Sequence, residues 1–285
     1  MPETHTHGHH HDHAASARDH GHGAGHADVL DLDALVVGHL DELLSWIDDR
    51  LTTAPARALD LGAGSGTGAI ALARFFPEAS VIALDRSTDM LSHLQDAVAR
   101  AGLDRRVATV HADADTEWPE MGSFDLVWAA SSLHHMSNPG LVLRRAHAAL
   151  AVDGVLAVTE MDGLPRFLPS DLGFGRPGLE QRCHDAMRER GWNAHPDWTS
   201  ALEEAGFVDV ERRTFTYRRE AVSAEARGYA RRIFATVRAH LGAMIGSADA
   251  ESIDRLLDDD DAGSLARRDD LVVTSARTIW VGRRG

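Results

Sequence analysis

A glycine-rich segment, ALDLGAGSGTG at residues 58–68, follows a short apolar run and would let a ligand approach the backbone closely. A dinucleotide site uses the spacing G-x-G-x-x-G and holds a pyrophosphate at a helix N-terminus. Counted from Gly62, the third glycine of that pattern falls on Thr67; counted from Gly64, it falls on Ala69, a tolerated variant. The phosphate loop of nucleoside triphosphatases also requires a lysine, and the sequence contains none. The segment therefore excludes a triphosphate loop and weakens, without removing, the dinucleotide interpretation.

Three aspartates stand at the ends of three successive apolar runs. Asp60 directly precedes the glycines, where a carboxylate would repel a pyrophosphate but attract an ammonium group. Asp85 lies 21 residues after Gly64 and can accept hydrogen bonds from both hydroxyls of a ribose. Asp113 is placed to accept a hydrogen bond from an adenine amino group. Any one of them could simply cap a loop, but together they predict a ligand with an amine, a ribose and an adenine.

Short apolar strands alternate with helices around these residues. The predicted strands are residues 58–61, 80–85, 106–113, 123–130 and 154–160, and the predicted helices between them are residues 67–75, 87–102 and 138–154. Such alternation predicts an α/β fold with a doubly wound, mostly parallel sheet that is covered on both faces.

The motifs as a set resemble those of the class I S-adenosylmethionine-dependent methyltransferases. The resemblance runs from about residue 56 to residue 160, through LDLGAGSG, ALDRS, ADA, FDLVWAASSLHH and LRRAHAALAVDGVLAVTE, and returns in the last two predicted strands. It implies a Rossmann-like sheet of seven strands whose last strand is antiparallel, with S-adenosyl-L-methionine as the cofactor.

The resemblance also implies a role for individual positions. It places Gly62 and Gly64 beside the methionine part of the cofactor, with Asp60 near the amino group and Asp85 on the ribose. It places Asp113 and Ala114 at the adenine edge and Arg86 over the adenine ring, where a guanidinium could stack. Ala129 would lie along the cofactor beside the fourth strand.

Residues that could act on an acceptor follow the fourth and fifth strands. In SSLHHM, we expect His134 to face the site as a general base and His135 to pack or to contact substrate. Glu160 ends the fifth strand and would orient an acceptor, unless it is a solvent-facing loop acid. Tyr229 and Arg232 are candidate substrate contacts in a later helical segment, although helical packing explains Tyr229 equally well.

The remaining chain supplies a cap and a lid. Leu35, Leu40, Leu43, Leu44 and Ile47 form a helical stripe before the core, and a helical insertion separates the last two strands. The predicted organisation is a disordered His-rich tail at 1–27, an N-terminal helical cap at 28–55, a cofactor-binding core at 56–222, a helical lid insertion at 223–270 and the closing strand of the core at 271–285.

Composition narrows the partners. The net charge of -15 argues against nucleic acid and anionic membranes, and no apolar run is long enough to span a bilayer. The single cysteine, Cys183, excludes disulfide scaffolds and multi-cysteine metal sites. The tail holds nine of the 18 histidines and is either a solvated segment or a weak metal binder, so we predict no defined metal site. We expect a cytoplasmic protein, with a homodimer left open.

Three functions remain for testing. The favoured one is methyl transfer to an oxygen or nitrogen of a small molecule, such as a specialised metabolite, because a helical lid suits a small buried acceptor. A nicotinamide-dependent oxidoreductase is opposed by Asp60 and by the lack of a Tyr-x-x-x-Lys pair. A non-catalytic cofactor-binding or metal-binding protein would depend on the His-rich tail.

Overall fold

The structure, a computed structural model, describes residues 24–285 except residues 193, 221, 222 and 243. The helices are α1 (Ala24–Val37), α2 (Leu40–Asp48), α3 (Thr67–Phe75), α4 (Thr88–Arg100), α5 (Pro139–Ala149), α6 (Leu179–Glu189), α7 (Thr199–Glu204), α8 (Ala224–Leu241), α9 (Ser247–Leu257) and the short 3-10 helix η1 (Leu133–His135). The strands are β1 (Arg57–Leu61), β2 (Ser80–Asp85), β3 (Val107–His111), β4 (Phe124–Ala130), β5 (Leu150–Met161), β6 (Phe207–Glu220) and β7 (Val272–Arg284).

The seven strands form one sheet in the order β3-β2-β1-β4-β5-β7-β6. The strands from β3 to β5 run parallel to their neighbours, whereas β7 is antiparallel to both β5 and β6. The predicted mostly parallel sheet with an antiparallel last strand is therefore confirmed. The chain crosses over between β1 and β4, so the carboxyl ends of β1, β2 and β4 border one crevice, where ligands of open α/β sheets bind.

Local sequence signals set the helix starts around that crevice. Ser87 caps α4 by accepting a hydrogen bond from the Met90 N–H at 3.3 Å. Asn138 caps α5 in the same way, through the Leu141 N–H at 3.0 Å, and Pro139 occupies the first helical position. These caps fix the ends of the loops that lead from β2 into α4 and from β4 through η1 into α5.

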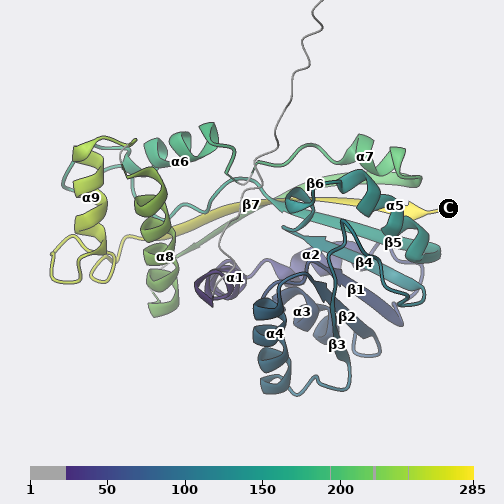
Figure 1. Cartoon of the computed structure of the whole chain (residues 1–285). Helices are drawn as coiled ribbons and strands as arrows, with labels where there is room; N and C mark the ends of the chain where they lie inside the picture. Colours follow the sequence, from purple (N-terminus) through teal and green to yellow (C-terminus); the bar gives the residue numbers. More distant parts are fainter. Residues whose placement is uncertain (1–23, 193, 221–222, 243) are drawn as a thin grey trace, which may run out of the picture.

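Helices cover both faces of the sheet (Figure 1). Helices α3 and α4 lie against β1, β2 and β3 on one face, while α5 and α7 pack on the other face near β5, β6 and β7. Each face has its own apolar core, and neighbouring residues of β4 divide between them: Trp128 belongs to the first core and Ala129 to the second. The alternation along each strand therefore decides which side chains can reach a given face.

The N-terminal cap differs from the prediction in two respects. Helix α1 begins at Ala24, inside the predicted tail, and Ala27 is already buried; the rest of the tail lies outside the described residues. Gly38, with a φ of +63°, separates α1 from α2, so the predicted stripe is split between two helices. Leu35 consequently lies on the outer side of α1 and is 67% exposed, whereas Leu43, on α2, is buried.

The segments after β5 form a helical layer at one end of the molecule. Helices α6, α8 and α9 gather there (Figure 1), with α8 packed against α1, α6 and α9. Strands β6 and β7 carry this layer, because α8 and α9 are inserted between them. Over the described ranges, the structure has no helix that is both long and apolar enough to traverse a bilayer.

Candidate functional site

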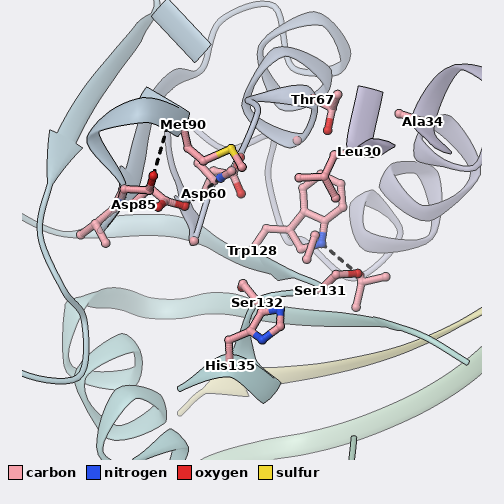
Figure 2. A pocket seen from close by; sticks show the side chains of 18 of the residues that line it. Leu30, Ala34, Asp60, Thr67, Asp85, Met90, Trp128, Ser131, Ser132 and His135 are labelled. Carbon is pink, nitrogen blue, oxygen red and sulfur yellow. Dashed lines mark hydrogen bonds between the residues drawn. The ribbon is translucent and has the colours of Figure 1, made fainter. Parts of the chain in front are cut away.

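A cavity of about 160 Å³ lies over the carboxyl ends of the central strands and is drawn in Figure 2. Among the residues predicted to hold a cofactor or substrate, those lining it are Asp60, Gly62, Gly64, Asp85, Arg86, Asp113, Ala114 and His135. The cavity thus brings together residues from the ends of three strands with the glycine loop. Five predicted residues are not part of the lining: Ala129, His134, Glu160, Tyr229 and Arg232.

The glycine loop approaches its neighbours too closely for side chains. Gly62 has a φ of +73°, and a Cβ there would lie 2.5 Å from the Cβ of Ser132. Ser132 cannot easily withdraw, because its hydroxyl donates to the Leu61 carbonyl at 2.6 Å. A Cβ on Gly68 would lie 2.8 Å from Oδ2 of Asp60. These glycines keep the backbone beside the cavity compact, as a ligand that runs along the loop requires.

We expect Gly62→Ala to weaken cofactor binding beyond its effect on folding. Gly173 is a matched control, because its φ is +78° and a Cβ there meets nothing within 4 Å. Both substitutions impose the same left-handed strain, which destabilises the fold by about 1–2 kcal/mol. Only Gly62→Ala also displaces Ser132 at the cavity wall. Urea unfolding and calorimetric titration of S-adenosylmethionine would measure the two effects; equal stability losses with unchanged affinity in both variants would contradict the assigned role of the loop.

Asp60 presents a buried acceptor to the cavity. Its side chain extends from β1 and is 2% exposed, and Oδ2 accepts no hydrogen bond from any residue in the described part of the chain. Burial, reinforced by the nearby charge of Asp85, raises the pKa of Asp60 to about 7, although a hydrogen bond from the Ala69 backbone acts in the opposite direction. A cavity-lining residue with a buried, unsatisfied carboxylate oxygen fits a cationic donor, such as the ammonium of a methionine moiety.

Asp85 ties the glycine loop to the start of α4. Its Oδ2 accepts the Gly64 N–H at 2.9 Å and its Oδ1 accepts the Ser87 N–H at 2.8 Å. Each carboxylate oxygen can accept a further hydrogen bond, so both remain able to receive ribose hydroxyls. Figure 2 shows Asp85 and Asp60 together at one end of the cavity, with Met90 beside them. The two acids predicted to bind the amino group and the ribose thus lie side by side in the cavity.

The loop after β3 forms the end of the cavity where the adenine was predicted. Asp113 lines the cavity, and its Oδ1 accepts the Asp115 N–H at 3.0 Å, so it also caps its own loop. Ala114 lines the cavity and is fixed from behind by Arg145, whose Nη1 donates to the Ala114 carbonyl at 2.6 Å. Arg86 borders the same end. All three residues predicted to contact the adenine thus line the cavity.

Two predicted residues, Ala129 and Glu160, face away from the cavity, because each directly follows the strand residue that lines it. Ala129 is 1% exposed and packs in the core on the opposite face, while Trp128 before it lines the cavity. Glu160 is fully buried outside the lining, while Thr159 before it lines the cavity. Trp128 and Thr159 meet there, with the indole N–H donating to the Thr159 hydroxyl at 3.0 Å. The predicted placements of Ala129 and Glu160 are therefore corrected by the alternation of β-strand side chains.

The histidine pair is oriented in the opposite sense to the prediction. His135 lines the cavity (Figure 2), whereas Nδ1 of His134 pairs with Oε2 of Glu160 at 2.7 Å. Successive residues of the 3-10 turn η1 point in different directions, so the two rings cannot serve one point. Their centroids are nevertheless only 4.0 Å apart. Glu160 therefore holds His134, and the His134 ring packs against His135.

The two lid residues contact α1 instead of the cavity. The Tyr229 hydroxyl is fully buried and donates to Oδ1 of Asp33 at 2.6 Å. Arg232 pairs with Asp28 at 2.6 Å near the surface. The structure thus places neither side chain at the cavity, where the prediction had them touch substrate. Both connect the N-terminal helix to α8.

Several lining residues were not foreseen. They include Leu30, Asp33, Ala34, His39, Trp128 and Arg277. Trp128 could have been found from strand alternation, but Asp33 and Arg277 are 244 residues apart and no local pattern links them. Within the described ranges, no group of three or more His, Cys, Asp and Glu side chains is arranged to hold a metal ion.

Comparison with known proteins finds relatives of the central part of the chain. Residues 58–154 match the family model described as a methyltransferase domain. A malonyl-[acyl-carrier protein] O-methyltransferase of Laribacter hongkongensis is 35% identical over 59% of this chain and 58% of its own length. A trans-aconitate 2-methyltransferase of Methylobacterium radiotolerans is 41% identical over 39% of this chain and 40% of its own. The chain thus spans about half the length of the curated relatives it matches.

Solved structures share the fold at lower identity. The YcgJ protein of Bacillus subtilis has a TM-score of 0.51 at 19% identity, covering 87% of this chain and 99% of that one. A phosphoethanolamine N-methyltransferase of Haemonchus contortus, solved with S-adenosyl-L-methionine, has a TM-score of 0.50 at 19% identity, covering 86% of this chain and 52% of that one. Residues 58–154 therefore match a methyltransferase domain, and the sheet built around them has the fold of these solved structures.

Proposed function

We propose that the protein transfers the methyl group of S-adenosylmethionine to an oxygen or nitrogen of a small acceptor molecule. The observation that carries the proposal is the buried, unsatisfied Oδ2 of Asp60 at the end of a cavity that also presents Asp85 and the glycine loop. A nicotinamide dinucleotide would bring a pyrophosphate to the same loop, where Asp60 would repel it. An ammonium group beside Asp60 instead supplies the missing donor.

The residues divide the cofactor as follows. Asp60 and the backbone of Gly62 and Gly64 would hold the amino-acid part, Asp85 the ribose, and the loop at Asp113 the adenine. When bound, the cofactor supplies a methyl group on a sulfonium, which is electrophilic without further activation. The chain's own residues therefore have to align the acceptor, exclude water and receive a proton.

His135 is the group we propose for the proton. A hydroxyl or protonated amine must lose a proton as it is methylated, and a neutral imidazole nitrogen on the cavity wall can accept it. His134 would act as a positioning residue: Glu160 fixes its ring through Nδ1, and the ring supports His135 from behind. The Laribacter relative is named an O-methyltransferase, which supports oxygen as the acceptor atom and a carrier-bound acceptor as one candidate.

Single substitutions should separate these roles. We expect His135→Ala to leave cofactor affinity unchanged and to lower turnover by about 100-fold. His134→Ala and Glu160→Gln should each have a smaller effect of about tenfold, and the double variant should be no slower than either single one, because they act through one hydrogen bond. Transfer of a labelled methyl group would measure all of them. Unchanged turnover in His135→Ala would refute its assignment.

The experiment that tests the function itself compares two cofactors. Calorimetric titration should give binding of S-adenosylmethionine and none of NAD, followed by label transfer to a panel of small hydroxyl, carboxyl and amine compounds and to carrier-bound acids. Binding of NAD alone would favour the oxidoreductase interpretation and overturn the proposal.

A further inference from the structure

A buried arginine forms the end of the cavity farthest from the ribose contact. Arg277 is 1% exposed and lines the cavity from β7. Asp85 is on β2, and β7 is the fourth strand from β2 in the sheet order. At the usual strand spacing, β2 and β7 are therefore roughly 19 Å apart. A cofactor held at Asp60, Asp85 and Asp113 ends near β1 and β4. The part of the cavity bordered by Trp128, Thr159 and Arg277 is thus left for the acceptor.

Arg277 is neutralised by a residue of the N-terminal helix. Its Nη2 donates to both carboxylate oxygens of Asp33, at 2.7 and 2.6 Å, and Asp33 also accepts the Tyr229 hydroxyl. Nη1 is occupied by the Ser275 hydroxyl and the Ala276 carbonyl. Asp33 is therefore held through one nitrogen rather than through the two-nitrogen fork that makes arginine–carboxylate pairs strongest. His39 also borders this end, and burial lowers its pKa to about 4, so it adds no charge near neutral pH.

Helix α1 forms one wall of the cavity in the described conformation. Leu30, Asp33 and Ala34 of α1 are part of the lining, and Leu30 Cδ1 lies 3.1 Å from the position of a Cβ on Gly64. The cavity of about 160 Å³ is smaller than the 300–1,000 Å³ typical of ligand pockets. A cofactor and an acceptor therefore need more room. Helix α1 is the element able to provide it, because β7 is hydrogen-bonded to a strand on both sides, whereas α1 is held by side-chain contacts such as those of Asp33 with Arg277 and Tyr229.

Withdrawal of α1 would remove Asp33 and leave Arg277 as an uncompensated buried cation at the acceptor end. Such a charge is strongly unfavourable unless an anion replaces the lost partner. We propose that the acceptor carries a carboxylate and that this carboxylate takes the place of Asp33 on Arg277. The inference rests on the proposed function and specifies its acceptor class. In this proposal α1 is a lid that the Asp33–Arg277 ion pair holds closed, and the carboxylate of the substrate breaks that pair.

The test compares matched carboxylates and amides on protein loaded with S-adenosylhomocysteine. The probes are benzoate against benzamide and malonate against malonamide, followed by ligand-observed NMR titration. Wild type should bind each carboxylate about tenfold more tightly than its amide. Asp33→Asn removes the internal competitor and should increase carboxylate affinity, whereas Arg277→Gln should abolish the preference. A purely structural ion pair predicts the same direction of change in both variants.

A double variant protects the test against misfolding. Asp33→Asn/Arg277→Gln removes both charges together, so no unpaired charge stays buried. It should keep the affinity for S-adenosylmethionine, since both residues lie away from the cofactor contacts, and it should bind acid and amide equally. The proposal is overturned if wild type shows no carboxylate preference up to about 10 mM, if Asp33→Asn fails to increase carboxylate affinity, or if the double variant retains the preference. Failure to bind S-adenosylmethionine would instead count against the proposed function.

Discussion

Cofactor affinity should fall about tenfold for each pH unit below 7, because Asp60 must lose a proton to receive the ammonium group. Burial raises the pKa of Asp60 to about 7, so in the free protein below that pH the carboxyl is protonated. The protonated form cannot pair with an ammonium, and binding therefore releases a proton. Above about pH 8 the cofactor's own α-amino group begins to lose its charge. Affinity should consequently be highest between about pH 7 and 8.

Asp60→Asn is the control for this dependence. The variant has no titrating group at this position, so its affinity should be low and nearly constant from pH 5 to about 7.5. Calorimetric titration at several pH values, in buffers of different ionisation enthalpy, would give both the affinity and the number of protons released. A wild-type affinity that does not change between pH 5.5 and 7.5 would show that Asp60 does not hold the cation.

The same substitution should stabilise the protein without its cofactor. A carboxyl whose pKa is raised by folding favours the native state least when it is ionised. The stability it contributes is complete below the unfolded pKa of about 4 and is lost as the pH rises toward 7. Asp60→Asn should therefore unfold at higher urea concentration than wild type at pH 8, but not at pH 4. A gain of stability together with a loss of binding is the expected signature of a binding group.

Asp85→Ala should reduce cofactor affinity by at least about 100-fold. Hydrogen bonds to a charged acceptor contribute about 1.5–3 kcal/mol each, and both ribose hydroxyls would lose theirs. The substitution also frees the Gly64 and Ser87 N–H groups, so the glycine loop loses its tie to α4. Calorimetric titration of S-adenosylmethionine would measure the loss.

Asp125 offers a matched control for the structural part of that effect. Its Oδ2 accepts the N–H groups of Ala56 and Arg57, at 2.8 and 2.9 Å, so it too bridges two backbone amides. Asp125 lies at the opposite ends of β1 and β4 from the cavity. Asp125→Ala should destabilise the fold by an amount similar to Asp85→Ala and leave cofactor affinity unchanged. Equal affinity losses in the two variants would mean that Asp85 acts only through loop structure.

The strand ends explain why much of the cavity lining could be predicted. Parallel strands bring their carboxyl ends to one edge, so Asp60, Asp85 and the loop at Asp113 had to meet once the strand order was known. The glycines could be predicted for a similar reason: Gly62 needs a positive φ and a close neighbour, and only glycine satisfies both. These features depend on short stretches of sequence and on one fold rule.

The sequence could not predict in the same way which face of the sheet each buried strand residue reaches. Strands covered on both faces are apolar throughout, so the pattern does not say whether Trp128 or Ala129 reaches the cavity. The orientations of His134 and His135 likewise depend on where Glu160 offers its carboxylate. The pairing of Asp33 with Arg277 joins the first described helix to the last strand, and only the folded chain reveals it.

The most direct measurement compares S-adenosylmethionine with 5′-methylthioadenosine, which lacks the amino-acid part, on wild type and on Asp60→Asn at pH 7.5. Calorimetric titration should show that Asp60→Asn weakens binding of S-adenosylmethionine by about 100-fold, the loss expected for a charge-assisted hydrogen bond in a buried site, and leaves binding of 5′-methylthioadenosine unchanged. An equal change for both ligands, or no change for either, would contradict the placement of the cofactor's ammonium group on Asp60.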